Sequence, residues 1–474
     1  MNKPPLHTDV PAPLADASAL AQIGAVAMAE AFRRKELSPV EATQAALDRA
    51  EEINPKFNAF TFLDAERALA AAHASERRWR SGKPLSPVDG IPTTLKDIVW
   101  VEGWRVSYGS HTTSQLPCSA DAPAVGLMRN AGSVFIGQTT TPEFGWKAVT
   151  DSPRFGVTRN PYDPSLTPGG SSGGAAVAAA TGAGVLHLGT DGGGSIRVPA
   201  AFTGIVGLKP TFGRVPAYPA SVFGTVAHLG PMARSVADAE LMLHAMSGRS
   251  ITDWAQGAGA LPALHSGQVE LRGQRIAYWR SPPQGHVDLA IQQRLDAVVE
   301  RLVQQGASVE VVDLPAAEIL NIFQRHWFSG AAARLAALPQ NAQAFMDPGF
   351  ISTARQGGDW SAAELVDAQN RRAAFGAAME SLLNDYDVLI SPAASILPFA
   401  AGMEVPPDGA YKHWTEWAGF SFPINLSQQP ALAMPCGTTE NGIPIGLQLV
   451  MSRGQDARLL ALGKTIELLL AASH

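Results

Sequence analysis

The stretch from Thr167 to Pro199 constrains the fold most, because its glycines and serines form two clusters that an ordinary buried segment does not contain. It reads TPGGSSGGAAVAAATGAGVLHLGTDGGGSIRVP. In the first cluster two pairs of glycines flank Ser171 and Ser172, and in the second three glycines directly precede Ser195. Glycine reaches backbone conformations closed to other residues and lets another group approach the main chain closely. The second cluster therefore predicts N–H groups that point toward one place beside a hydroxyl.

The segments between the clusters predict a helix followed by a strand. Residues 175–181 are good helix formers, and residues 185–190 form an apolar run of strand length. A turn of successive backbone N–H groups binds anions, and beside a nucleophile it serves as an oxyanion hole. We therefore predict that Ser195 is a nucleophile and that an oxyanion is held by the N–H groups of Gly192, Gly193 and Gly194.

A serine hydroxyl is a weak nucleophile at neutral pH and needs a base within hydrogen-bond reach. His187 lies in the middle of the predicted strand, between two leucines, and is interpreted as a histidine packed beside a sheet. Upstream, Lys96 ends the short β-branched run GIPTTLKD and is a candidate base. Taken alone, a lysine in that place is more often a solvated strand end than a base.

The three segments GIPTTLKD, GGSSGG and GTDGGGSIR resemble the amidase signature family of serine hydrolases. Matched position by position, the resemblance implies a Ser-Ser-Lys triad of Lys96, Ser171 and Ser195. Ser171 would relay protons between Ser195 and a neutral, buried Lys96, and the peptide bond before Ser171 would be cis. Gly192 departs from the family pattern, which more often has a small β-branched residue there, and this departure predicts a looser turn.

The resemblance continues through TPEFGW at 141–146, where Glu143 is interpreted as a loop carboxylate that caps N–H groups, and through 385–392 and 420–450. It implies an α/β fold, with a large mixed β-sheet core flanked by helices on both faces. We expect one amidase domain over residues 1–474, with a flexible lead at 1–17, a signature core at about 70–250 and a variable substrate-pocket region at about 267–380. Arg197 is expected to support the glycine turn by pairing with Asp191.

Apolar periodicity and capping signals predict the remaining elements. The helices are expected at 19–35, 38–53, 64–80, 235–246 and 288–305, with another that Asp121 caps and that ends near Asn130. The strands are expected at 133–137, 275–278 and 308–312, and Asn441-Gly442 predicts a hairpin turn.

Charge and cysteine content exclude several function classes. The formal net charge is −6, and the lysines and arginines are spread along the chain, so neither nucleic-acid nor membrane-surface binding is predicted. No run of about 18 apolar residues occurs. Two cysteines are too few for a disulfide framework or a metal cluster and fit a reducing compartment, so we expect a cytoplasmic protein without metal or cofactor. A homodimer is suggested by the family alone.

The predicted reaction is hydrolysis of a small-molecule amide, ester or carbamate through an acyl-enzyme on Ser195. One alternative keeps the family and makes the chain the glutamine-hydrolysing component of a glutamyl-tRNA amidotransferase complex, although AYPASVFGTVAHL at 217–229 departs from the polar stretch usual there. Another is an α/β-hydrolase-type esterase that uses Ser171 or Ser172 on a nucleophile elbow, with His228 or His413 as base. That elbow requires a strand directly before the serine, whereas here a proline turn precedes it.

A third alternative is a module that binds phosphate or a nucleotide on the glycine loops. Against it, no lysine follows the glycines as a P-loop requires.

Overall fold

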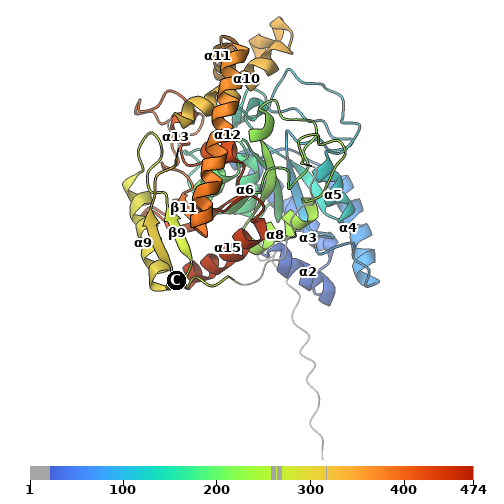
Figure 1. Cartoon of the computed structure of the whole chain (residues 1–474). Helices are drawn as coiled ribbons and strands as arrows, with labels where there is room; N and C mark the ends of the chain where they lie inside the picture. Colours follow the sequence, from blue (N-terminus) through green and yellow to red (C-terminus); the bar gives the residue numbers. More distant parts are fainter. Residues whose placement is uncertain (1–21, 258–262, 264–268, 316–317, 473–474) are drawn as a thin grey trace, which may run out of the picture.

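The computed structural model describes residues 22–257, 263, 269–315 and 318–472, and its centre is one mixed sheet of 11 strands (Figure 1). The strand order is β1-β3-β2-β6-β8-β7-β12-β13-β11-β9-β10. The strands are β1 (Phe60–Leu63), β2 (Pro92–Lys96), β3 (Val134–Thr139), β6 (Leu186–Asp191), β7 (Val206–Lys209), β8 (His228–Ala233), β9 (Arg275–Tyr278), β10 (Ser308–Val311), β11 (Val388–Pro392), β12 (Ala431–Thr438) and β13 (Pro444–Val450). A separate hairpin pairs β4 (Asp151–Ser152) with β5 (Gly156–Val157).

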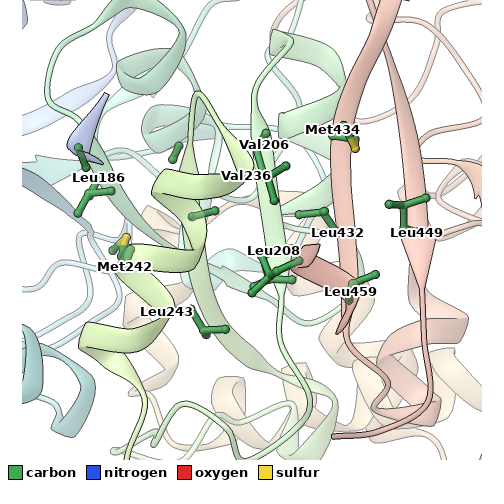
Figure 2. Close-up of a cluster of buried hydrophobic side chains, with 14 of the residues drawn as sticks. Leu186, Val206, Leu208, Val236, Met242, Leu243, Leu432, Met434, Leu449 and Leu459 are labelled. Atoms are coloured by element: carbon green, nitrogen blue, oxygen red, sulfur yellow. The ribbon is translucent and has the colours of Figure 1, made fainter. Parts of the chain in front are cut away.

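Helices cover both faces of this sheet. Alternate side chains of one strand point to opposite faces, and here both sets are apolar and must be buried. In β12, Leu432 and Met434 join the hydrophobic cluster under α8 and α15, whereas Ala431 and Ala433 join a second cluster with α6, α7 and α12. Figure 2 shows Leu432 near Leu459 of α15, with Met434 farther along the same strand and with residues of α8 in the same cluster. The predicted mixed sheet with helices on both faces is therefore confirmed.

The helices largely follow the periodicity of the sequence. Their bounds are α2 (Ala25–Arg34), α3 (Pro39–Phe57), α4 (Ala65–Arg80), α5 (Pro123–Asn130), α6 (Gly173–Thr181), α7 (Arg197–Thr203), α8 (Val236–Met246), α9 (Leu289–Gln304), α10 (Ile319–Ala336), α11 (Pro348–Gly358), α12 (Ala362–Asp385), α13 (Trp414–Trp417), α14 (Phe422–Ser427) and α15 (Asp456–Ala471). The capping box predicted at Ser38 is present, and Asp64 and Ser235 cap α4 and α8. The predicted flexible lead at 1–17, and the start of the helix predicted from residue 19, lie outside the described residues.

One predicted cap was wrong. The residue at the N-cap of α5 is Ala122 and not Asp121, because Pro123 occupies the first helical position. The Asp121 carboxylate instead accepts the N–H of Glu102 at 2.8 Å and pairs with Arg129 at 2.7 Å. It therefore fixes the loop after β2 to α5.

The order of three parallel strands positions the candidate site. β2 lies between β3 and β6 and is parallel to both, with Leu95 opposite Leu188. The carboxyl ends of parallel strands meet at one edge, where ligands bind in open α/β sheets. Lys96, at the end of β2, therefore lies beside the end of β6, from which the glycine turn continues.

Candidate active site

Lys96 is fully buried, and three hydroxyl groups surround its amine. Its Nζ lies 2.7 Å from Oγ of Ser171, 2.9 Å from Oγ of Ser172 and 2.9 Å from Oγ1 of Thr190. The Ser172 hydroxyl donates to the carbonyl of Thr190 at 3.1 Å, so Nζ must donate to Ser172. A neutral amine has two N–H donors and one lone pair, which leaves it able to accept the proton of Ser171 or of Thr190.

Burial lowers the pKa of Lys96 well below its usual value of 10.5, because a charged ammonium loses its hydration there. The carboxylate of Asp191 opposes this shift, but it does not form an ion pair with Lys96, since it is already paired with Arg197. The neighbouring Asp97 is also buried, and burial raises its pKa to about 7. Its carboxyl group accepts the N–H groups of Ser107 and Gly109, so it holds the loop after β2.

Ser171 and Ser172 lie where the first glycine cluster turns into α6. The peptide bond between Gly170 and Ser171 is cis, as the family resemblance implied. A Cβ atom on Gly170 would collide with the backbone of Val149, so only glycine fits there. Ser172 occupies the N-cap position of α6, yet its hydroxyl makes no capping bond, because it binds Lys96 and the backbone of Thr190.

The second glycine cluster is held by a buried ion pair. Asp191 accepts from Nε and Nη2 of Arg197 at 3.0 and 2.9 Å, and Asn425 donates to the same carboxylate at 2.9 Å. The structural role predicted for Arg197 is confirmed. The Arg197 guanidinium holds the pKa of Asp191 well below its usual range. The turn between these two residues is thereby fixed at both ends.

One predicted oxyanion donor is engaged elsewhere. The N–H of Gly194 donates to Oδ1 of Asp191 at 2.8 Å, so the prediction that it faces an oxyanion was wrong. Gly194 has φ of +116°, a conformation that favours glycine. Among the described residues no acceptor is found for the N–H groups of Gly192, Gly193 and Ser195. These three N–H groups are therefore not used within the described chain.

Two tryptophans pack against this turn. A Cβ atom on Gly192 would lie 2.7 Å from Cζ3 of Trp327, and one on Gly193 would lie 2.6 Å from Cη2 of Trp414. Gly192 therefore gives room to an indole ring, which explains the missing β-branched side chain. The turn is packed, contrary to the loosening that the departure from the family pattern suggested.

Ser195 and Ser171 line the same cavity, which has a volume of about 860 Å³. The N–H of Ser172 donates to the carbonyl of Ser195 at 3.1 Å and ties the two glycine clusters together. No hydrogen bond joins the Ser195 and Ser171 hydroxyls in this part of the described chain, and such bonds often tighten only when a substrate is bound. Aromatic side chains form much of the wall: Trp100, Tyr108, Phe144, Phe212, Tyr218, Phe223 and Trp327.

The other candidate residues take structural positions. His187 is buried with its Nδ1 2.8 Å from the Thr94 hydroxyl, and burial lowers its pKa to about 3, as expected for a packed histidine. Glu143 accepts from the Ser110 hydroxyl and from the N–H of Asp347, so it caps a loop as predicted. Among the described residues no group of three His, Cys, Asp or Glu side chains could hold a metal ion.

The nucleophile elbow is absent, because residues 167–170 before Ser171 form no strand. His228 lines the cavity, but its Nδ1 contacts the carbonyl of Val226 at 2.8 Å and its Nε2 lies 3.3 Å from Nζ of Lys209. His413 precedes α13, with its ring against Phe328. Neither histidine contacts Ser171 or Ser172.

Thr190 and Arg334 were not predicted as site residues. The Thr190 hydroxyl is the third hydroxyl in contact with the Lys96 amine. The only signal in the sequence for this contact is that Thr190 lies near the end of β6, the strand predicted before the glycine turn. Arg334 lies in the variable region predicted at about 267–380 and reaches the cavity wall from α10. No local pattern marks it.

The chain belongs to the Amidase family, whose sequence profile matches residues 41–460. It is therefore a hydrolase of carbon–nitrogen bonds. It is 32% identical to an acylamidase of Rhodococcus erythropolis over 94% of this chain and 95% of that protein. It is 33% identical to the A subunit of a glutamyl-tRNA(Gln) amidotransferase of Chloroflexus aggregans, over 90% and 92%. The structure of a bacterial aryl acylamidase of the amidase signature enzymes matches with a TM-score of 0.86 and 26% identity, over 94% and 96%.

No helix in the described ranges combines the length and the apolar character needed to cross a membrane.

Proposed function

We propose that this enzyme hydrolyses amides through an acyl-enzyme on Ser195, with Ser171 as proton relay and Lys96 as base. The observation that carries the proposal is the buried amine of Lys96, whose pKa is lowered and which contacts the Ser171 hydroxyl at 2.7 Å. A neutral amine in that place can take a proton that an ordinary lysine could not.

In the proposed reaction Oγ of Ser195 forms a bond to the carbonyl carbon of the amide. The proton of Ser195 passes to Oγ of Ser171, while the proton of Ser171 passes to Nζ of Lys96. The N–H groups of Gly192, Gly193 and Ser195 stabilise the negative oxygen of the tetrahedral intermediate. The carbon–nitrogen bond then breaks, and the departing amine receives the proton back through Ser171. Water cleaves the acyl-enzyme by the same proton route and restores Ser195.

The aromatic cavity wall supports a substrate with an apolar acyl or aryl part. Esters and carbamates pass through the same kind of intermediate, so we include them as substrates. The acylamidase and aryl acylamidase relatives agree with this choice. Cys118 and Cys436 are both free thiols, which supports a cytoplasmic location, and a homodimer remains our expectation from the family.

The amidotransferase relative supports a second candidate, release of ammonia from glutamine within a complex. Against it, residues 217–223 contribute Tyr218, Val222 and Phe223 to the cavity, which is apolar surface where a glutamine side chain would need polar partners. Hydrolysis of a simple anilide by the purified chain alone would favour the first candidate.

A fluorophosphonate tests the proposed nucleophile and base together. The wild type, Ser195→Ala and Lys96→Ala are each treated with the reagent. Intact-mass spectrometry then measures the adduct, and peptide mapping locates the modified residue. We expect one adduct on Ser195 in the wild type, none in Ser195→Ala and slow labelling in Lys96→Ala. An adduct on Ser171 or Ser172 would contradict the assignment of the nucleophile.

A further inference from the structure

Arg334 is an arginine in the cavity wall without a hydrogen-bonded protein partner among the described residues. It belongs to α10 and lines the same cavity as Ser171 and Ser195. Its guanidinium carbon lies 4.5 Å from the ring centre of Phe144 and 5.9 Å from that of Tyr108. Its Nε is buried without an acceptor, and in the described part of the chain no hydrogen bond or ion pair is found for its other nitrogens.

The surrounding charges do not neutralise Arg334 directly. Burial lowers the pKa of the Arg334 guanidinium, and Glu143 opposes this shift only from a distance, because its two oxygens accept from the Ser110 hydroxyl and from the N–H of Asp347. Asp253, the carboxylate that lines the cavity, accepts the N–H groups of Ala217 and Ala255. The cation–π contacts with Phe144 and Tyr108 hold the guanidinium beside two rings, while its N–H groups have no hydrogen-bond acceptor among the described residues.

The position of Arg334 relative to the glycine turn follows from α10. Trp327, which packs against Gly192, lies about two helical turns earlier on the same helix and therefore on the same face. Two turns correspond to about 10 Å along the helix axis. Phe144, whose ring Arg334 contacts, is next to Gly145 in the chain. A Cβ atom on Gly145 would lie 3.4 Å from Oγ of Ser171, so this segment connects Arg334 with the triad. Arg334 therefore lines the same cavity as Ser171 and Ser195, about two helical turns along α10 from the contact of Trp327 with the glycine turn.

We infer that Arg334 selects amides whose apolar part ends in a carboxylate or a similar anionic oxygen group, bound away from the scissile bond. The inference rests on the proposed function, because it assigns a specificity residue to the same site. A guanidinium binds a carboxylate through two parallel N–H···O bonds, and here both partners would be partly removed from water. The aromatic wall between Arg334 and Ser171 would hold the apolar part of the substrate.

The inference is tested with pairs of substrates that differ in one charge. On the acyl side, 4-nitroanilides of succinic, glutaric, adipic and suberic acid, each with one free carboxylate, are compared with straight-chain acyl 4-nitroanilides of matched length. On the amine side, 4-(butanoylamino)benzoate is compared with N-butanoyl-4-toluidine. kcat and KM are measured for the wild type, Arg334→Gln, Arg334→Lys and the control Arg325→Gln, which changes an arginine on the same helix outside the cavity lining.

We expect Arg334→Gln to raise KM for the anionic member of at least one series by about 10- to 100-fold, with kcat and the neutral substrates little changed. Arg334→Lys should have an intermediate effect, because lysine keeps the positive charge but cannot form the two parallel N–H···O bonds of a guanidinium. Arg325→Gln should leave every ratio unchanged. Equal effects of Arg334→Gln on charged and neutral members, or no effect on either, would overturn the inference.

The design separates the two proposals. A wild type that hydrolyses the neutral anilides without any charge preference contradicts only the role of Arg334. A wild type that hydrolyses none of the anilides and is not labelled on Ser195 contradicts the proposed function itself.

Discussion

Replacing Lys96 by methionine should strongly reduce activity and yet stabilise the protein at neutral pH. The side chains have similar lengths, so the change removes the amine without leaving a large cavity. Loss of a general base lowers rates by about 10²- to 10⁴-fold. We therefore expect a fall of that size in kcat/KM and in the rate of fluorophosphonate labelling.

The effect on stability follows from the burial of the amine. If Lys96 is neutral in the folded protein at pH 7, deprotonating it from its usual pKa of 10.5 costs about 5 kcal/mol at about 1.4 kcal/mol per pH unit. Methionine removes this cost but also removes three hydrogen bonds, worth about 1 kcal/mol each. The Lys96→Met variant should thus be about 2 kcal/mol more stable than the wild type at pH 7.

The sign of this difference should change with pH. Between the lowered pKa of folded Lys96 and 10.5 the unfolded chain binds more protons, so the wild type gains stability as pH rises. At pH 9 the cost of deprotonation is only about 2 kcal/mol, and the variant should be less stable than the wild type by about 1 kcal/mol. Thermal unfolding at both pH values measures this reversal, with the exposed Lys83→Met as control.

A difference in stability that does not change with pH would refute the reasoning, because it would mean that Lys96 remains charged in the fold. The pH profile of labelling gives an independent check. The labelling rate should rise with pH as Lys96 loses its proton and should level off before about pH 9. Asp97, whose pKa is raised to about 7, also titrates in this range. The Asp97→Asn variant identifies its contribution, because a rising limb that belongs to Lys96 should persist in it.

Three further changes test the surroundings of the site. Asp191→Asn should cost about 3–5 kcal/mol in thermal unfolding, since it leaves the buried guanidinium of Arg197 without its carboxylate, and a loss below about 1 kcal/mol would contradict this. Gly192→Val should lower kcat because its side chain meets the Trp327 ring, and Trp327→Leu in the same chain should restore part of the loss if this contact is the cause. His187 stays neutral in the fold down to about pH 3, whereas unfolded histidine binds a proton below about 6.5, so stability falls as pH falls through this window by up to about 5 kcal/mol. His187→Gln should show a shallower loss between about pH 6 and 4 in thermal unfolding, and an unchanged slope would count against burial as the cause.

The sequence alone determined the elements and the motif residues, because both are local properties. Apolar spacing and capping signals placed α3, α4, α8 and α9 within a few residues of their bounds. The segments around Lys96, Ser171 and Ser195 identified the family, and each is short enough to be read from neighbouring residues. The prediction that Asp191 and Arg197 form a pair succeeded for the same reason, since only six positions separate them.

What surrounds those residues follows from contacts between segments that lie far apart in the chain. The amine of Lys96 meets Thr190 because β2 and β6 are neighbours in the sheet, although 94 positions separate the two residues in the chain. Trp327 fills the space beside Gly192, and Arg334 reaches the same cavity, because α10 packs across the glycine turn. Periodicity tells which face of an element is buried but not which distant element covers it. The chemistry of the triad is therefore readable in the sequence, while the shape and charge of the substrate site arise from packing between distant segments.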